Sequence, residues 1–307
     1  MDFISVLNQA SVLFILLIIG FVVKKFNIMT DELGKGISKL VIYVTLPALI
    51  ITAMNYKFSE EMMENSIKLL LIGIGVYAFI LLISVVFLKV FHVEDIKKRG
   101  VYQFLTIFGN VGFMGYPIVE VIFGKIGVFY AAIYNIWFNI LIWTLGVILV
   151  TPERNNKINL RSLINPGIIS IGIGFLLFLF SIELLEPIYI SLDKLGASTI
   201  PMSMLVVGSL LGDMKFKEIF TNSRLMVSAL IKLIIIPLVV YFVLSMFNLS
   251  PIVIGIPVII SAMPSAVNAA IFARIHESDY RLASQGVFLT TTLSIITIPL
   301  IMLLLTM

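Results

Sequence analysis

The amino-acid sequence predicts an all-α membrane protein with ten transmembrane helices. Of its 307 residues, 60% are hydrophobic and only 12% are charged, and the mean hydropathy is +1.12. A soluble domain carries about twice that charged fraction. Apolar stretches recur between short charged clusters, as in a chain that crosses the bilayer many times. The chain has no cysteine, so disulfides and thiolate metal sites are excluded.

The apolar stretches define the predicted spans. In chain order these are Val6–Val23, Leu40–Met54, Ile67–Leu88, Val101–Phe123, Gly127–Val150, Pro166–Ile182, Thr199–Leu211, Leu225–Phe247, Pro251–Ala273 and Leu282–Leu305. No basic residue precedes the first span, and Lys24 and Lys25 follow it. This charge order is the reverse of that in a signal peptide, so we expect an uncleaved first helix. The second and seventh spans, which contain Pro47 and Pro201, are expected to be unusually short.

The distribution of basic residues predicts the topology. Sixteen of the 21 Lys and Arg lie in loops that follow the odd-numbered spans, four lie on the other side, and Lys232 lies inside the eighth span. Because cytoplasmic loops are rich in Lys and Arg, both termini are expected outside the inner (plasma) membrane. The excess of Lys and Arg on one side of the membrane therefore explains the net charge of +4, and no nucleic-acid partner is expected.

The chain divides into two predicted halves, residues 1–150 and 166–307, joined by a short cytoplasmic connection at 151–165. Each half holds five spans. Because five is odd, a repeated half must enter the membrane in the opposite sense, which gives the inverted repeat of many secondary transporters.

One span in each half is interrupted, at Gly109–Pro117 (GNVGFMGYP) and at Ser261–Ala270 (SAMPSAVNAA). Proline removes a backbone donor, and polar backbone at membrane depth survives only where protein or a water-filled cavity covers it. A matched pair of interrupted spans predicts a transporter binding site. We expect the helices to break at Pro117 and Pro264, with the following half-helices pointing their N-termini at one place.

Such helix ends attract anions, because their N–H groups are free and the helix dipole is positive there. Together with the amides of Asn110 and Asn268, two facing ends can hold a carboxylate without a fixed cation. The alternative is a packing kink whose asparagines bond only to neighbouring helices.

Further polar residues are candidates for the same cavity. Asn135 and Asn139 are four apart and so share a helix face. The residues that could join them are Tyr116, Tyr134, Ser261, Ser265, Gln285 and Thr290. Interhelical hydrogen bonding is the competing interpretation for each of them. Trp137 and Trp143 are interpreted as packing residues or lipid anchors.

Charged residues inside the spans are few. Lys232 is either a snorkelling side chain, the favoured interpretation, or a substrate contact. Glu120 is expected to pair with Lys125, and a coupled proton on Glu120 is the alternative. No acidic cluster predicts a metal site, although carbonyl and hydroxyl oxygens could still hold sodium. No nucleophile elbow, phosphate-binding glycine loop or HExxH motif is present, so neither an enzyme nor a cofactor is predicted.

Three motifs carry a resemblance to a known family: Asn110–Pro117 followed by Gly124–Trp143, Ala262–Arg274, and Ser284–Pro299. In this order the chain resembles the auxin efflux carrier family, which includes plant PIN-type carriers and bacterial organic-acid permeases. The short connection between the halves is similar to that of a prokaryotic member.

The resemblance implies two inverted five-helix repeats whose fourth and ninth helices cross. Spans one, two, six and seven would form a scaffold and homodimer surface, and the other spans a mobile transport domain that moves like an elevator. The implied function is secondary transport of small organic anions, auxin-like monocarboxylates or malate-like dicarboxylates. A ligand sensor that does not transport, a channel, and a sodium-coupled symporter similar to the bile-acid symporters are the alternatives.

Overall fold

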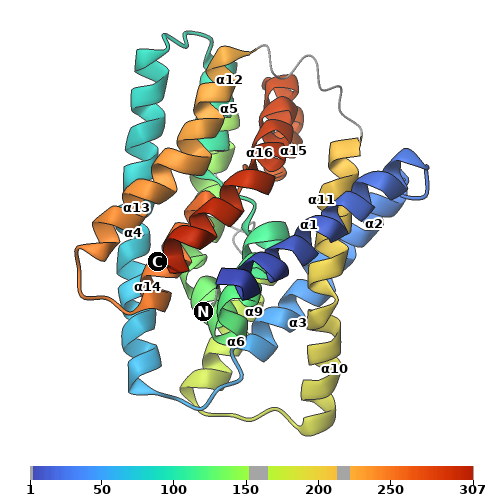
Figure 1. Ribbon diagram of the computed structural model, residues 1–307, viewed down its shortest axis with the longest axis vertical. Helices are drawn as coiled ribbons and strands as arrows, with labels where there is room; N and C mark the ends of the chain where they lie inside the picture. Colours follow the sequence, from blue (N-terminus) through green and yellow to red (C-terminus); the bar gives the residue numbers. More distant parts are fainter. Residues whose placement is uncertain (1–2, 152–164, 213–221, 307) are drawn as a thin grey trace.

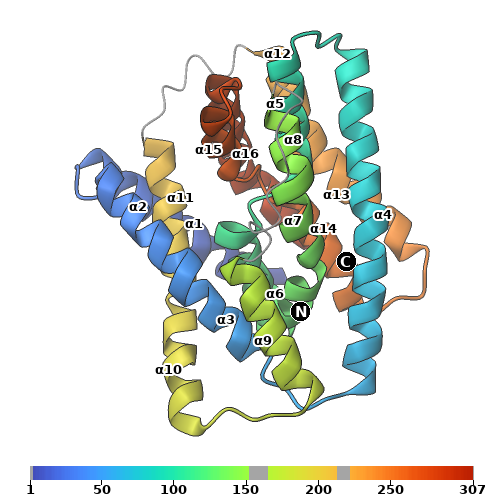
Figure 2. The same cartoon turned by 180° about the vertical axis from the view of Figure 1, so that it is seen from behind.

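The computed structural model describes residues 3–151, 165–212 and 222–306, and almost all of them are helical (Figures 1 and 2). The first half contains α1 (Phe3–Lys25), α2 (Asp31–Leu40), α3 (Leu46–Ala53), α4 (Glu60–Val90), α5 (Ile96–Ile107), α6 (Tyr116–Tyr134), α7 (Ile136–Leu141) and α8 (Val147–Val150). The second half contains α9 (Pro166–Leu179), α10 (Glu186–Ala197), α11 (Thr199–Gly212), α12 (Ser223–Leu230), α13 (Ile236–Ser245), α14 (Pro251–Ala262), α15 (Asn268–Ile275) and α16 (Tyr280–Thr306). The π-helical turns are η1 (Val41–Thr45), η2 (Val111–Gly115), η3 (Ile142–Gly146) and η6 (Ile231–Ile235).

Within the described ranges, six helical stretches are long and apolar enough to cross a membrane. They are Asp31–Ala53, Glu60–Val90, Val111–Val150, Glu186–Leu210, Ser223–Ser245 and Tyr280–Leu305. The chain is therefore an all-helical protein with several candidate spans, and the count of ten and the inverted repeat stay predictions.

The expectation that the second and seventh spans are short is wrong. The helical stretches there are 23 and 25 residues long. Each begins with an amphipathic segment, α2 or α10, whose charged residues lower the mean hydropathy. The apolar pattern therefore marked only the second part of each helix.

The basic clusters of three loops lie at one end of the molecule. The turn between α4 and α5, the start of α12 and the turn before α16 all lie at the top of Figure 1, whereas residues 54–59 and 180–185 lie at the bottom. Several basic residues of the predicted cytoplasmic loops fall outside the described ranges, namely Arg154, Lys157, Arg161, Lys215 and Lys217. In the described part of the chain, the helix starts that carry Lys97, Lys98, Arg99, Arg224 and Arg281 all lie at this end.

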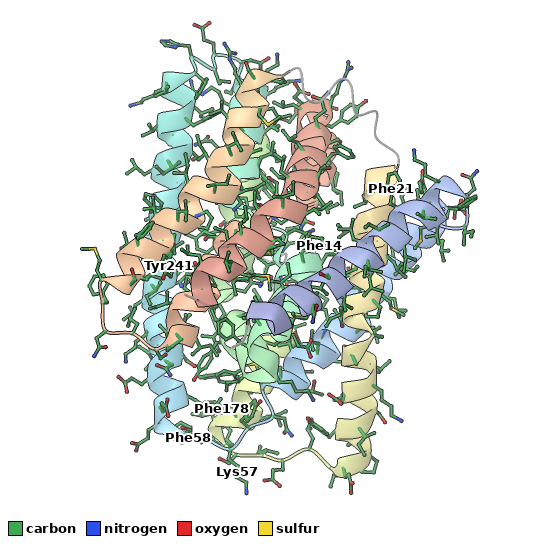
Figure 3. The ribbon with its side chains drawn as sticks, viewed as in Figure 1. Phe14, Phe21, Lys57, Phe58, Phe178 and Tyr241 are labelled. Carbon is green, nitrogen blue, oxygen red and sulfur yellow. The ribbon has the colours of Figure 1, made fainter. Side chains whose placement is uncertain are left out.

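At the opposite end, contacts join the two halves of the chain. Phe58 packs on Phe178 with ring centroids 5.5 Å apart, and the ammonium group of Lys57 lies 3.1 Å from a carboxylate oxygen of Glu183 (Figure 3). These contacts hold the α3–α4 turn against α9 and the turn that follows α9.

Helices α1, α2, α3, α9, α10 and α11 pack on one another and form what we call the six-helix group. Its tightest contact joins α1 to α11. A Cβ atom on Gly20 would lie 2.4 Å from the carbonyl oxygen of Leu205, and one on Gly208 would lie 1.9 Å from that of Leu17. The two backbones therefore touch directly, which only small residues permit. This group comprises the helices expected to form the scaffold.

Three prolines are accommodated inside helices by the π turns that precede them. The N–H groups of Leu46, Tyr116 and Ile236, the residues just before Pro47, Pro117 and Pro237, each bond to the carbonyl five residues back. Proline lacks the N–H that would continue the α-helical pattern, and a π turn absorbs the mismatch. The expectation that the fourth span breaks at Pro117 is therefore wrong.

The break in the first half lies earlier, at residues 108–110, and that in the second half lies at residues 263–267, around Pro264. Gly109 pairs with Ser265 in a single antiparallel β-bridge. The Asn110 N–H donates to the Pro264 carbonyl at 2.6 Å, and the Ala266 N–H donates to the Phe108 carbonyl at 2.9 Å. Each interrupted segment thus satisfies the polar backbone of the other, as burial in a membrane requires. We call this pairing the crossing.

We expect Gly208→Val to lower the stability of the protein, because its side chain would push α1 away from α11. Overpacking of this kind costs about 1–3 kcal/mol. The measurement is the thermal unfolding midpoint of purified protein in detergent. Gly172→Val is the matched control, since a Cβ atom there meets no atom within 4 Å. Equal midpoints for the two variants would contradict the close α1–α11 packing.

Candidate functional site

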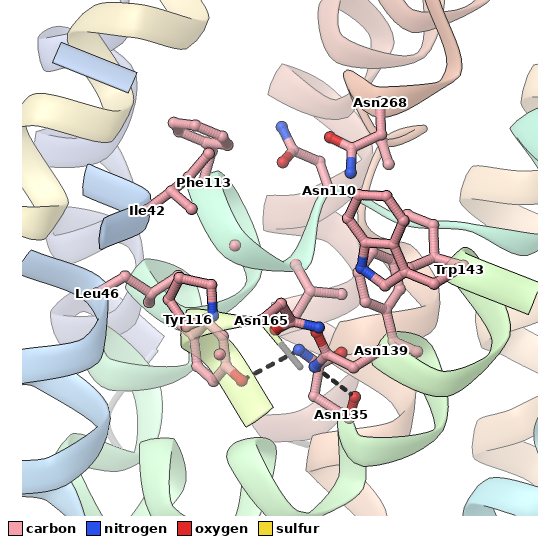
Figure 4. Close-up of a pocket in the computed structure, with 18 of the residues that line it drawn as sticks. Ile42, Leu46, Asn110, Phe113, Tyr116, Asn135, Asn139, Trp143, Asn165 and Asn268 are labelled. Atoms are coloured by element: carbon pink, nitrogen blue, oxygen red, sulfur yellow. Dashed lines mark hydrogen bonds between the residues drawn. The ribbon is translucent and has the colours of Figure 1, made fainter. Parts of the chain in front are cut away.

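A cavity of about 340 Å³ lies beside the crossing (Figure 4). Residues from the six-helix group, including Leu46 and Ile50 of α3, form one wall. The crossing itself, η2, α6, α7, η3 and α15 supply the rest. Among the described residues that line it, none carries a charged side chain. Any ligand held here is bound by dipoles, amides and apolar contacts. We call this space the crossing cavity.

Backbone N–H groups at two helix starts are free beside this cavity. After the crossing, the chain enters η2, and the N–H groups of Gly112 and Phe113 donate to no described residue. The same is true of Val267 and Asn268 at the start of α15. Gly112, Phe113 and Asn268 line the cavity. The first turns of η2–α6 and α15 therefore present the positive end of a helix dipole to it.

Two amide side chains that line the cavity have a buried atom without a hydrogen-bond partner. These atoms are Nδ2 of Asn110 and Oδ1 of Asn135, and each residue is only 4% exposed. Asn135 donates through Nδ2 to the Tyr116 hydroxyl at 3.1 Å, and the Asn139 side chain donates to the backbone carbonyl of Asn135 at 3.0 Å. A buried polar atom without a partner is costly, so these groups favour a ligand that can bond to them.

The structure brings five of the predicted site residues together at this cavity: Asn110, Tyr116, Asn135, Asn139 and Asn268. Figure 4 shows them in two sets, with Asn110 and Asn268 on one side and Tyr116, Asn135 and Asn139 on the other. The cavity therefore has a polar patch at each of two sides, and apolar side chains that include Phe113 and Ile42 line a further side.

The other predicted residues do not line this cavity, and several hold the crossing instead. The Ser265 hydroxyl donates to the Leu105 carbonyl at 2.7 Å, and the Ser265 N–H donates to the Thr290 hydroxyl oxygen at 3.0 Å. Ser261 donates to the carbonyl of Val258 in its own helix. The hydroxyl groups of Ser261, Ser265 and Thr290 thus bond to the protein and do not line the crossing cavity, and their contact with a substrate stays a prediction.

Pro117 and Pro264 shape the backbone and do not line the cavity. Gln285 lies elsewhere, in a separate cavity with Arg224 and Arg281. Gln285 lies near the start of α16, about a turn and a half before Thr290, and this distance along the helix places it away from the crossing cavity.

Sequence reasoning missed lining residues contributed by α9. Asn165 and Gly167 line the cavity, and the Asn165 side chain accepts a hydrogen bond from the N–H of Ile168 at 3.1 Å, which caps α9. The Asn-Pro-Gly sequence is a recognisable helix start, but nothing local shows that this start faces Asn139. Trp143 also lines the cavity while packing on Phe272, so its interpretation as a packing residue was incomplete.

The favoured interpretations of both intramembrane charged residues were wrong. Lys232 does not snorkel, because the residue is only 1% exposed. Lys125 pairs with Asp193 and donates to Tyr189 at 2.9 Å, so it does not pair with Glu120. Gly124 interrupts the helix between them with φ of +66°. One carboxylate oxygen of Glu120 is buried without a partner.

The chain matches the membrane transport protein family over residues 5–159 and 151–302. It belongs to this family of transporters. The match agrees with the auxin efflux carrier motifs, and it identifies a transporter rather than an enzyme. No group of three His, Cys, Asp or Glu side chains in the described residues is placed to hold a metal ion.

Curated relatives of the transporter are prokaryotic. An uncharacterized transporter of Methanocaldococcus jannaschii is 24% identical over 297 residues, covering 94% of this chain and 95% of the relative. An uncharacterized transporter of Methanothermobacter thermautotrophicus is 24% identical over 294 residues, which cover 93% of this chain and 94% of the relative. A protein of Rhizobium meliloti named "Putative malonate transporter" is 22% identical over 294 residues, which cover 92% of this chain and 90% of the relative. The similarity therefore extends along nearly the whole transporter.

We expect Thr290→Val to destabilise the transporter, because the buried N–H of Ser265 loses its acceptor. The cost of one such unsatisfied group is about 1–3 kcal/mol. Thr291→Val is the matched control, since the Thr291 hydroxyl bonds only to the carbonyl of Val287 in its own helix. Thermal unfolding and substrate affinity are measured together. Reduced affinity with unchanged stability would show that Thr290 contacts the substrate instead.

Proposed function

We propose that the transporter is a secondary carrier that moves small organic anions through the crossing cavity. The observation that carries this proposal is the convergence of free backbone N–H groups and the unpaired Asn110 amide on a cavity lined by no charged side chain. Helix starts of this kind bind anions. Neutral donors hold an anion without the strong attraction of a fixed cation, so the anion can also be released.

The two polar sides of the cavity favour a dicarboxylate over a monocarboxylate. One carboxylate would accept from Gly112, Phe113 and the amides of Asn110 and Asn268. The other end would meet Tyr116, Asn135 and Asn139. The Asn135 amide can present either its oxygen or its NH₂ group, because the Tyr116 hydroxyl can both donate and accept. The name of the Rhizobium meliloti relative, which specifies malonate, supports this substrate class.

The position of the cavity supports an elevator-like mechanism. One wall comes from the six-helix group and the remainder from the crossing and the helices around it. Movement of the crossing relative to the six-helix group would carry the bound anion across the membrane. Following the family resemblance, the six-helix group would be the fixed scaffold and the surface of a homodimer.

Glu120 and Lys232 are the candidates for coupling or charge compensation. Both are ionisable groups at membrane depth, and such residues in transporters are usually functional. Neither lines the crossing cavity. Any role in coupling would therefore act through the helices that carry them, α6 and η6.

Counterflow in proteoliposomes tests the proposed function. We expect malonate or malate exchange by the wild type, and a loss of at least tenfold when one substrate carboxylate is replaced by an amide, about 1.4 kcal/mol or more of binding. Asn110→Ala and Asn268→Ala are expected to abolish exchange while leaving the unfolding midpoint nearly unchanged. Asn248→Ala, at an exposed turn away from the cavity, is the control.

The same experiment separates the alternatives. A ligand sensor would bind the anion without exchange, and a channel would give currents far above carrier turnover. Replacing sodium by potassium at fixed pH should leave exchange unchanged, because no acidic cluster that could hold sodium occurs in the described residues. A strong sodium requirement would favour a sodium-coupled symporter. Wild-type exchange by both asparagine variants would contradict the crossing site.

We further propose that both termini lie outside the inner membrane and that the basic loops face the cytoplasm. The chain has no native cysteine, so single cysteines report on topology directly. On intact cells, an impermeant thiol reagent should label Lys57→Cys and not Glu94→Cys, because these exposed positions lie at opposite ends of the molecule. The reverse labelling would overturn the topology.

A further inference from the structure

A second polar cavity, of about 220 Å³, lies at the end of the molecule that carries the basic loops. Its charged lining comes from three segments far apart in the sequence: Lys98 at the start of α5, Arg224 at the start of α12, and Asp279 and Arg281 at the start of α16. We call it the basic cavity. It is separate from the crossing cavity and shares no lining residue with it.

Most of the charged side chains among the described lining residues of the basic cavity are positive. Three cationic side chains face one carboxylate, that of Asp279. This carboxylate also accepts a hydrogen bond from the Leu282 N–H at 2.9 Å, which caps α16. The described residues that line the cavity therefore have a formal surplus of two positive charges. A surplus of this size in one concave site favours an anionic ligand.

The remaining lining supplies neutral hydrogen-bonding groups. Tyr102, which is 3% exposed, Asn222 and Gln285 all line the cavity. The Asn222 side chain caps α12 by accepting from the N–H of Leu225 at 3.2 Å. Basic residues at this end are expected from membrane sidedness. The preference of basic residues for the cytoplasmic side does not explain why three of these residues surround one concave site that also contains a buried tyrosine.

We propose that the basic cavity binds a phosphate group, supplied either by the headgroup of an anionic lipid or by a soluble phosphate compound. Two arginines favour phosphate, because each guanidinium can donate a pair of parallel hydrogen bonds to its oxygens. Lys98 adds a third positive charge. Basic pockets between helices at the cytoplasmic face of membrane proteins bind lipid headgroups in the same way.

The occupant would brace the helices that hold the crossing. Tyr102 precedes Leu105 by three residues on α5, and the Leu105 carbonyl accepts from the Ser265 hydroxyl. Gln285 precedes Thr290 by five residues on α16, and Thr290 accepts from the Ser265 N–H. A phosphate group between α5, α12 and α16 therefore ties together the elements on either side of the crossing. This role does not depend on which anion is transported.

The test uses purified full-length protein in nanodiscs. In the first arm the discs contain only phosphatidylcholine, and inorganic phosphate is titrated against sodium chloride of equal ionic strength. In the second arm phosphatidylglycerol is added to the discs without phosphate in solution. The unfolding midpoint is measured in both arms, and it should rise in at least one, because a ligand that binds only the folded state stabilises it.

The variant Arg224→Gln with Arg281→Gln should weaken the stabilising ligand about tenfold or more. Lys89→Gln with Lys97→Gln is the matched control, which removes the same charge from exposed positions that do not line the cavity. Lys98→Gln provides a milder single variant at an exposed position, should the double variant fold poorly.

Stabilisation by phosphate in phosphatidylcholine discs identifies a soluble phosphate compound as the ligand class, and a response to phosphatidylglycerol only identifies a lipid headgroup. The proposal is overturned if chloride acts as well as phosphate and phosphatidylglycerol gives no rise. It is equally overturned if the arginine variants respond as the lysine control does.

Discussion

The antiparallel pairing of residues 108–110 with residues 264–266 is the interaction on which the rest of the structure depends. Two helices are interrupted at the same place, and each segment satisfies only part of its own backbone. The hydrogen bonds from Asn110 to Pro264 and from Ala266 to Phe108 satisfy each segment with the other. Ser265 then fixes the pair to Leu105 and Thr290. Neither half of the chain can form its break alone, because an open break at membrane depth would leave unpaired polar groups.

The crossing also explains where the binding chemistry lies. The helices that follow it begin with N–H groups that no carbonyl accepts, and these starts face a cavity lined by neutral amides and aromatic rings. Charged side chains lie elsewhere, for example in the Lys125–Asp193 and Lys57–Glu183 pairs and around the basic cavity. This separation leaves the proposed substrate site uncharged, which suits a carrier that must release the anion it binds.

Much of this arrangement could be predicted from the sequence. Composition and charge distribution indicated a multispanning helical protein, and the Asn-Gly-Pro patterns indicated two breaks and most of the asparagines at the cavity. The exact place of the first break could not be predicted, because the π turn that absorbs Pro117 leaves no local signal. The role of Asn165 was missed because it depends on tertiary packing. Ser265, Thr290 and Gln285 are recognisable from the sequence as polar residues within apolar spans. Whether such a residue supports the crossing, lines another cavity or contacts a substrate depends on its neighbours in the folded protein, which the sequence does not show.

The most direct test of the central claim is a structure of the transporter with a dicarboxylate bound. The account predicts one carboxylate within hydrogen-bond distance, about 3 Å, of the Gly112 or Phe113 N–H and of the Asn110 or Asn268 amide. It also predicts that the other end of the ligand lies toward Tyr116 and Asn135. A dicarboxylate found at Arg224 and Arg281 with the crossing cavity free of it would contradict the account.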